Sequence, residues 1–291
     1  MDIIKFISTS NRPVLLDGGM GTQLDAAGYK MGGQNNLSNP DAVLTIHKNY
    51  AASGADLLIT NTLTMNRIYI ESEGDDVDVR EVNLAGARLA REAAADGKYV
   101  LGDIGSTGKI LQPFGPLTLE QANQVYQEQA SILAEGGVDG FIVETMFDLQ
   151  EALCALRACR SVSDLPVFVS MAFHSAKNGG HTIMGNSSED CARSLTDAGA
   201  SVVGANCGDI DPQQMAEIVQ VMVAASSLPV IAQPNAGKPK QAHGQTVFDM
   251  TPTDFSNGIQ ACLDAGARLV GGCCGTTPAH IQAVSDLLEA G

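Results

Sequence analysis

Two adjacent cysteines near the end of the sequence are the residues best suited to chemistry. Cys273 and Cys274 lie in GGCCGTTP, which runs from Gly271 to Pro278, and a third cysteine, Cys207, ends an earlier apolar stretch. Deprotonated thiols act as nucleophiles and as metal ligands, and two neighbouring thiols can also form a disulfide. The three cysteines therefore indicate a metal site, a redox pair or inert buried thiols.

Three thiolates from two strand ends can hold one zinc ion and leave its fourth position open. Structural zinc sites are usually closed by four protein ligands, whereas catalytic sites keep a position for water or substrate. If the substrate is itself a thiol, zinc lowers its pKa, so the nucleophilic thiolate exists at neutral pH. The pattern of Cys207, Cys273 and Cys274 thus favours a catalytic Zn2+ site, one per chain, with inert or redox thiols and a structural metal as open alternatives.

The elements that must bring these sulfurs together repeat along the chain. Four segments begin with a glycine and continue through an apolar run that ends in polar or reactive residues. They start at Gly54, Gly137, Gly199 and Gly266 and end at Asn61-Thr62, Glu144-Thr145, Asn206-Cys207 and Cys273-Cys274. Four further apolar runs start at Val14, Tyr99, Pro166 and Pro229. Each glycine suits the position just after a helix, and each apolar run suits a buried strand.

Helix start signals separate these strands. An N-cap candidate precedes proline at Asn39, Asp211, Thr251 and Thr277, and Thr118 with Gln121 forms a capping-box pattern. Eight buried strands that alternate with helices predict an α/β fold, a (β/α)8 TIM barrel in a single domain over residues 1–291. A doubly wound open sheet is the alternative fold.

The barrel prediction places one end of every strand at a common mouth. Active sites of this fold lie at the carboxyl ends of the strands. The apolar runs give way there to polar and reactive residues: Asp17, Asn61, Asp103, Glu144, Asn206, Cys207, Asn235, Cys273 and Cys274. We therefore expect the three cysteines and the carboxylates to lie around one site.

Composition excludes some classes of partner. The formal net charge of -16 argues against nucleic acid and anionic membranes, and no apolar run approaches the length of about 20 residues that a membrane span needs. The opening MDIIKFIS lacks a basic region, and the cysteine count of 7 is odd, so a reduced, cytoplasmic protein is expected. The cysteines on helical stretches are expected to be buried core residues: Cys154, Cys159, Cys191 and Cys262.

Five segments at separate strand ends resemble the homocysteine S-methyltransferase family, most closely the homocysteine-binding barrel of cobalamin-dependent methionine synthase. They are LLDGGMGTQL from Leu15, VETMFDLQEA from Val143, GANCG from Gly204, AQPNAG from Ala232 and GGCCGTTPAHI from Gly271. The resemblance implies a zinc-dependent S-methyltransferase that activates the homocysteine thiol and methylates it to methionine. It places Cys207, Cys273 and Cys274 at the family's zinc positions.

Besides its thiol, homocysteine carries an ammonium and a carboxylate, and each of these groups needs a binding partner in the protein. Asp17 and Glu144 end two strands and can accept the ammonium hydrogens, and the resemblance implies the same role. The glycine-rich turn with Gly18 and Gly19 offers backbone N–H groups to the carboxylate. The resemblance further implies that Asn235 lies close to the zinc. His174 and His181 show no metal-ligand spacing and are interpreted as loop residues.

The methyl donor is the least determined part of the prediction. The sequence contains no Asp-x-His-x-x-Gly stretch of the kind that ligates cobalamin in the relatives. The methyl group is brought either by a corrinoid partner protein carrying methylcobalamin or by a small donor that enters the barrel, and the low aromatic content favours the corrinoid partner. Small sulfonium or ammonium donors, S-methylmethionine or betaine, favour aromatic cages, and this chain has no Trp and 4% aromatic residues. The sequence also reads CGDIDP from Cys207, where relatives often continue towards Gly-Pro.

Two further hypotheses remain at this stage. One keeps the barrel and the zinc but uses another small thiol as the acceptor. The other, from a different class, is a non-catalytic barrel whose cysteine pair is a redox or structural staple.

Overall fold

The eight apolar runs of the sequence form eight parallel strands of one sheet in the computed structural model, which describes residues 2–94, 97–242 and 245–290. The strands are β1 Val14–Leu15, β2 Leu57–Ile59, β3 Tyr99–Ile104, β4 Gly140–Met146, β5 Val167–Met171, β6 Val202–Asn206, β7 Val230–Gln233 and β10 Leu269–Val270. β10 lies between β7 and β1, and a bridge between Leu16 and Leu57 joins β1 to β2. The TIM barrel is confirmed, and the doubly wound open sheet is wrong because the two edges of the sheet meet.

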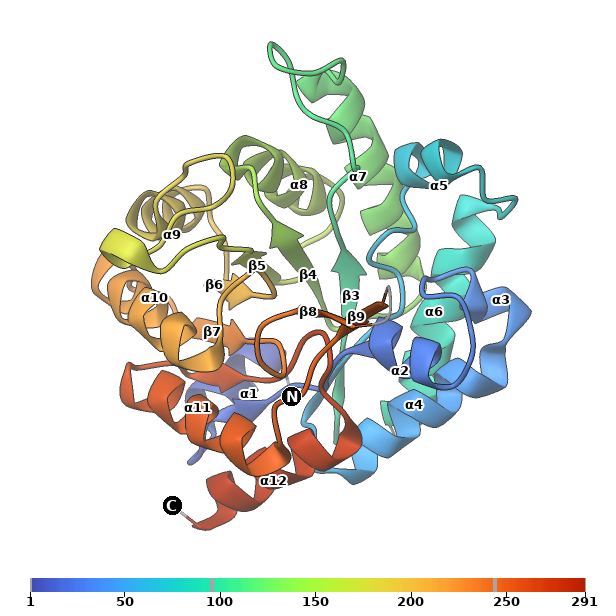
Figure 1. Ribbon diagram of the computed structural model, residues 1–291. Helices are drawn as coiled ribbons and strands as arrows, with labels where there is room; N and C mark the ends of the chain where they lie inside the picture. Colours follow the sequence, from blue (N-terminus) through green and yellow to red (C-terminus); the bar gives the residue numbers. More distant parts are fainter. Residues whose placement is uncertain (1, 95–96, 243–244, 291) are drawn as a thin grey trace.

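Helices surround the barrel and connect its strands (Figure 1). They are α1 Ile3–Thr9, α2 Met20–Ala26, α3 Asn35–Ser38, α4 Pro40–Ala52, α5 Arg67–Glu73, α6 Val79–Ala94, α7 Leu119–Glu135, α8 Leu149–Val162, α9 Ser188–Asp197, α10 Pro212–Ala225, α11 Pro252–Asp264 and α12 Pro278–Ala290. Capping boxes begin α7 at Thr118 and α10 at Asp211, as their sequence signals indicate.

The glycines that begin the four repeated segments lie directly after helices. Their φ angles are 95° at Gly54, 79° at Gly137, 87° at Gly199 and 103° at Gly266. Residues with a Cβ avoid this left-handed region, so glycine ends each helix at low cost and lets the chain turn into the next strand.

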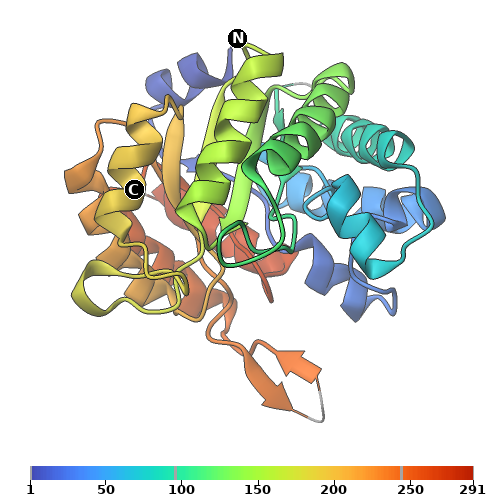
Figure 2. The same ribbon diagram turned by 90° about the horizontal axis from the view of Figure 1, so that it is seen from above.

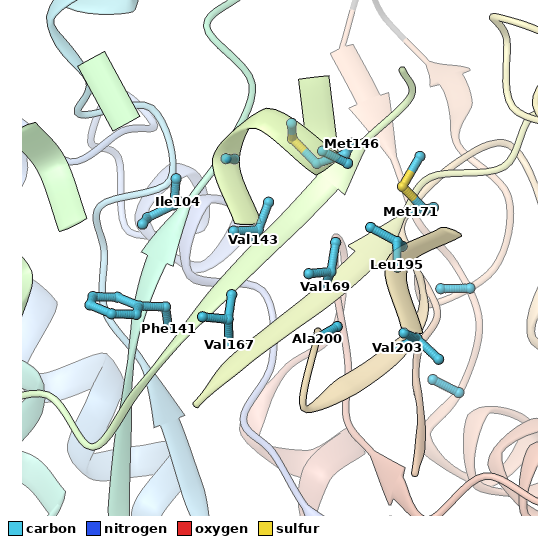
Figure 3. Packing of buried hydrophobic residues seen from close by; sticks show 14 of the residues in the cluster. Ile104, Phe141, Val143, Met146, Val167, Val169, Met171, Leu195, Ala200 and Val203 are labelled. Atoms are coloured by element: carbon cyan, nitrogen blue, oxygen red, sulfur yellow. The ribbon is translucent and has the colours of Figure 1, made fainter. Parts of the chain in front are cut away.

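Alternate strand residues build two cores. Residues on the outer face of β4 to β6 pack against the surrounding helices, among them Phe141, Val143, Val169 and Val203 (Figure 3). The opposite face forms a separate cluster inside the barrel, whose strand residues are Val14, Leu16, Leu57, Leu101, Ile142, Phe168, Val202, Ile231 and Leu269. Since strand side chains alternate between faces, both clusters follow from the apolar runs.

Helix α1 closes the amino-terminal end of the barrel. Its Ile3 and Ile7 are each 2% exposed and belong to the inner cluster. The Arg268 guanidinium, just before β10, donates to the carbonyls of Ile7 and Ser10 at 2.8 and 2.5 Å. This helix was not predicted from the sequence, and it excludes water from one end of the barrel.

A two-stranded hairpin, β8 Lys240–Ala242 and β9 Gln245–Val247, was also not predicted. Figure 2 shows it projecting from the end of the barrel opposite α1. Among the described residues, no helix combines the length and the apolar character that crossing a membrane requires.

Because Ile7 of α1 is buried in the inner cluster of the barrel, Ile7→Ala should strongly destabilise the protein. Truncating this buried side chain should lower the free energy of unfolding by about 2 to 4 kcal/mol through lost burial and a residual cavity. Ile110→Ala, at a position 52% exposed, is the matched control and should change it by less than about 0.5 kcal/mol. Urea denaturation followed by circular dichroism measures both, and equal losses would contradict this closure by α1.

Candidate active site

The structure brings the three predicted sulfurs together at the carboxyl end of the barrel. Cys207 follows β6, Cys273 and Cys274 follow β10, and their Sγ atoms all lie within 4.8 Å of one another. The Cys207 N–H donates to the Gln233 carbonyl at 3.1 Å, and the Cys273 N–H donates to the Pro234 carbonyl at 2.9 Å. Both cysteine loops are therefore fixed to the end of β7, the strand between them.

A buried amide connects three strand ends around this cluster. Asn206 accepts from the Thr145 N–H at 2.9 Å and donates through Nδ2 to Thr145 Oγ1 at 2.8 Å. The same Nδ2 lies 3.9 Å from the Cys273 sulfur. From the sequence Asn206 was expected to orient ligands or line the cavity. Its contact with Thr145 was not predicted, because a contact between distant strands depends on the register of the barrel.

The three thiols of the cluster differ in pKa. Hydrogen bonds from Cys273 and Cys274 hold the pKa of Cys207 well below its usual value, against the opposing effect of burial. The same contacts raise the pKa of Cys273 and raise that of Cys274 to about 12. Cys273 and Cys274 thus favour the thiolate form of Cys207 by donating hydrogen bonds to it.

This donor set fits a soft metal ion. All three cysteines are free rather than disulfide-bonded. Zn–S bonds of about 2.3 Å at tetrahedral angles would separate the sulfurs by about 3.8 Å, within the span of this cluster. Thiolates select zinc and other soft ions over magnesium or calcium. Cys207, Cys273 and Cys274 can therefore hold a metal ion.

Three buried carboxyl groups lie at the same end of the barrel. Burial raises the pKa of Asp17 and of Asp103 well above the usual value, and it raises that of Glu144 to about 8. The charge on Cys207 raises the Glu144 pKa further, while a hydrogen bond from Gln233 lowers it. Within the described chain, Asp103 Oδ1 and Glu144 Oε2 have no hydrogen-bond partner. These two oxygens are free to accept from a ligand.

A cavity of about 290 Å3 joins the carboxylates to the sulfurs, and we call it the carboxylate cavity. Its lining includes Gly18, Gly19, Asp103, Glu144, Cys207, Cys273 and Cys274. Asp17 is not part of this lining; its Oδ2 accepts from the Ile59 N–H at 3.0 Å. Of the two strand-end acids predicted to bind an ammonium, Glu144 thus lines the cavity and Asp17 lies behind its wall.

The glycine turn is pressed against the cysteine loop. A Cβ on Gly18 would lie 2.5 Å from Thr276 Oγ1, and one on Gly19 would lie 2.5 Å from the Cys273 carbonyl. The Gly19 N–H donates to Thr276 Oγ1 at 2.9 Å, and that hydroxyl donates to the Cys273 carbonyl at 2.7 Å. Thr276 was not predicted from the sequence as a link between turn and cluster.

Asn235 lies on the other side of Cys207. Its Nδ2 donates to the Gly208 carbonyl at 3.0 Å, and a side-chain hydrogen bond from it also lowers the pKa of Cys207. Its Oδ1 is buried and, in the part of the chain that the structure describes, has no partner. An amide oxygen in this place is a candidate ligand or an acceptor for substrate.

The remaining predictions concern residues outside the cluster. Asn61 lines the carboxylate cavity. His174 and His181 lie in the loop after β5, and His174 Nδ1 lies 2.6 Å from a carboxylate oxygen of Asp209. The four helical cysteines are buried, as predicted: Cys154, Cys159, Cys191 and Cys262.

Comparison with known proteins gives a family match over nearly the whole chain. Residues 14–288 match the family described as Homocysteine S-methyltransferase. The metallated form of the Escherichia coli homocysteine methyltransferase MmuM superposes with a TM-score of 0.80 at 21% identity, covering 97% of this chain and 98% of that one. Its oxidized form gives 0.81 at 20% identity over 99% and 100%.

A more distant likeness concerns the fold alone. The carboxyl transferase domain of Rhizobium etli pyruvate carboxylase gives a TM-score of 0.56 at 14% identity, covering 99% of this chain and 49% of that one. The solved structures named here are all below 25% identity, so they support the barrel fold rather than a particular site.

The raised pKa of Glu144 predicts a pH-dependent stability of the metal-free protein. Between the ordinary value of 4.5 and about 8, the folded state holds this proton more tightly than the unfolded state does. The free energy of unfolding should therefore fall as pH rises through this window, by up to about 1.4 kcal/mol per pH unit from this group. Glu144→Gln should flatten that slope in denaturant titrations from pH 5 to 8, and identical slopes would contradict the assignment.

Proposed function

The chain belongs to the homocysteine S-methyltransferase family and is a methyltransferase, and we propose that it methylates the sulfur of homocysteine to give methionine. The observation that carries this proposal is the cluster of Cys207, Cys273 and Cys274 at the wall of a cavity that also contains buried carboxyl groups. Homocysteine carries a thiol and an ammonium on one short chain. The cavity offers a partner for each.

We propose that the three cysteines hold one Zn2+ per chain. The bound zinc would supply a Lewis acid that keeps the thiol of the substrate deprotonated at neutral pH. The protein's own part is to fix the ligands: Asn206 orients Cys273 from the end of β6, and Asn235 lies beside Cys207. Such supporting contacts commonly tune metal affinity as much as the ligands do.

The ammonium of the substrate would face Glu144, with the carboxyl group of Asp17 behind it. Entry of a cation favours the charged form of a buried carboxyl group, so we expect Glu144 to lose its proton when the amino acid binds. Gly18 and Gly19 let this turn lie directly against Thr276 and Cys273, and the substrate carboxylate would approach the first backbone N–H groups of α2. Homocysteine would thus lie with its sulfur towards the cysteines.

For the methyl donor we propose a corrinoid partner protein that carries methylcobalamin. The cysteine cluster lies at the open end of the barrel, opposite the end that α1 closes, and a separate donor protein can reach it there. A second candidate is a small donor, S-methylmethionine or betaine, which is favoured by a phenylalanine-lined cavity beside Cys207. Seven free thiols are compatible with the reducing cytoplasm, where we place the reaction.

Cys207→Ser tests the metal site. The variant should lose most of the roughly one zinc per chain that we expect in the wild type, because one of three protein ligands becomes a poor one. Cys262→Ser, a buried core cysteine on α11, is the matched control and should keep its zinc. Elemental analysis after dialysis gives the stoichiometry, and circular dichroism confirms that both variants fold. Full zinc retention by Cys207→Ser would rule out the site.

Methionine formation tests the reaction. Zinc-replete protein with homocysteine should produce methionine with methylcobalamin and not with methylated folate alone, while turnover with S-methylmethionine or betaine would favour the small-donor candidate. X-ray absorption should also show one additional sulfur ligand on the zinc when homocysteine is added. Unchanged zinc–sulfur coordination would contradict homocysteine as the acceptor and favour another thiol, or a structural or redox role for the cysteines.

A further inference from the structure

A second cavity of about 440 Å3 lies beside the carboxylate cavity, and the two share only Thr145 and Cys207 among their lining residues. We call it the phenylalanine cavity, because Phe147, Phe173 and Phe248 form its walls. We propose that the phenylalanine cavity receives the methyl donor, and that its aromatic walls determine which donor is used. This inference rests on the proposed function and assigns the two substrates of that reaction to separate cavities.

Polarity decides which cavity takes which substrate. The carboxylate cavity contains Asp103 and Glu144, each with a buried oxygen that lacks a partner among the described residues. Asp209 supplies the carboxylate in the lining of the phenylalanine cavity, and this group is exposed and paired with His174. Homocysteine therefore finds buried carboxylates for its ammonium only in the carboxylate cavity. The cationic methyl-bearing centre of a small donor, or the apolar face of a corrin, finds aromatic walls in the phenylalanine cavity.

Methyl transfer also requires that the acceptor chain and the methyl donor reach the reacting sulfur from different sides. The sulfur attacks the methyl carbon from the side opposite to the departing carrier, so the acceptor chain and the donor lie on different sides of the new bond. Cys207 belongs to the metal-binding cluster and lines both cavities. A sulfur held at this cluster is therefore reached from the carboxylate cavity by its own chain and from the phenylalanine cavity by the donor.

Backbone strain occurs at the boundary between the cavities. Thr145 and Cys207 have φ angles of 58° and 54°, and only one other non-glycine residue in the described chain, Asn178, has a positive φ. Such conformations cost about 1 to 3 kcal/mol each and persist where the surroundings impose them. Asn206 imposes one of them through its two hydrogen bonds to Thr145. The two strained residues are the two that divide the cavities.

The loop after Cys207 holds the far wall in place. The Asp209 N–H donates to the Phe173 carbonyl at 3.2 Å, and a Cβ on Gly208 would lie 2.2 Å from that carbonyl oxygen. The pair between Asp209 and His174 joins the same two loops at the entrance. The sequence CGDIDP, which departs from the pattern of the relatives, thus supplies a side chain that ties the cavity wall to the metal-binding loop.

The aromatic walls suit an electrophilic methyl group on an apolar-faced carrier. Three of the eight phenylalanines in the chain gather here, although the overall aromatic content is low. Phenyl faces attract a methyl group on cationic sulfur or nitrogen, and they also pack against a macrocycle. A corrin is too wide to enter and would cover the entrance, where Phe147 and Ile183 are 38% and 70% exposed.

The test compares Phe147→Ala with Tyr69→Ala, a matched pair of partly exposed aromatic side chains. Phe147 lines the phenylalanine cavity and Tyr69 lines the carboxylate cavity. Phe147→Ala should raise the KM of the donor about tenfold and leave the KM of homocysteine within about twofold. Tyr69→Ala should raise the KM of homocysteine and spare that of the donor. Methylcobalamin, S-methylmethionine and betaine are supplied separately.

Two further variants separate the donor sources. With methylcobalamin, Ile183→Ala at the entrance should add to the effect of Phe147→Ala, because a corrin would rest on both side chains. With a small donor, Phe173→Leu in the depth of the cavity should raise the KM of the donor and Ile183→Ala should not. Either pattern supports the assignment of the cavity and identifies the source.

Binding measurements distinguish failure of this inference from failure of the proposed function. Calorimetric titration of each donor and of homocysteine into the same protein reports binding without turnover. If homocysteine does not bind, the proposed function fails, whatever the donors do. If no donor binds, or if Phe147→Ala changes neither the KM nor the calorimetric affinity of any donor, the assignment of the phenylalanine cavity is overturned. The assignment is also overturned if Phe147→Ala raises the KM of homocysteine and leaves the KM of every donor unchanged.

Discussion

The active end of this barrel is organised by buried groups of one sign of charge. Asp17, Asp103 and Glu144 lie near a cluster of three thiols, and none of the ion pairs among the described residues includes these carboxyl groups. Buried like charges cannot all be ionised in the absence of cations, so the free protein holds protons instead. Burial first, and then the charge of Cys207, raise the pKa of Glu144, while hydrogen bonds from the two neighbouring thiols lower the pKa of Cys207. A metal ion and an ammonium group are the cations that would relieve it.

The rest of the barrel supplies the stability that offsets this arrangement. Its interior below the mouth is a continuous apolar cluster, and α1 closes the amino-terminal end of the barrel. A second, larger cluster joins the outer faces of the strands to the helices. The division matches a general property of this fold, in which one end of the strands supports stability and the other carries the site.

The barrel and the position of the cysteine cluster could be predicted from the sequence. The repeat of glycine, apolar run and polar end gives the order of the strands and places the polar residues at the same position in each repeat. That shared position alone predicts that Cys207 lies beside Cys273 and Cys274. Contacts that depend on register could not be predicted: the link from Asn206 to Thr145, and the role of Thr276 beneath the glycine turn. Helix α1 was missed because a single short segment has no repeat to identify it. The low aromatic content also concealed the gathering of three phenylalanines, since composition says nothing about position.

The position of the strained residues connects the barrel's geometry with its chemistry. A regular strand end would continue in its own direction and leave one undivided mouth. At Thr145 and Cys207 the backbone instead turns through a conformation that non-glycine residues avoid, and these two residues form the boundary between a polar and an apolar cavity. The cost is offset locally, because Asn206 and the Gln233 carbonyl hold the two turns by hydrogen bonds. In the reaction we propose, the acceptor would present its ammonium to the polar cavity and the donor its methyl group to the aromatic one, so that both would meet at the sulfur beside Cys207.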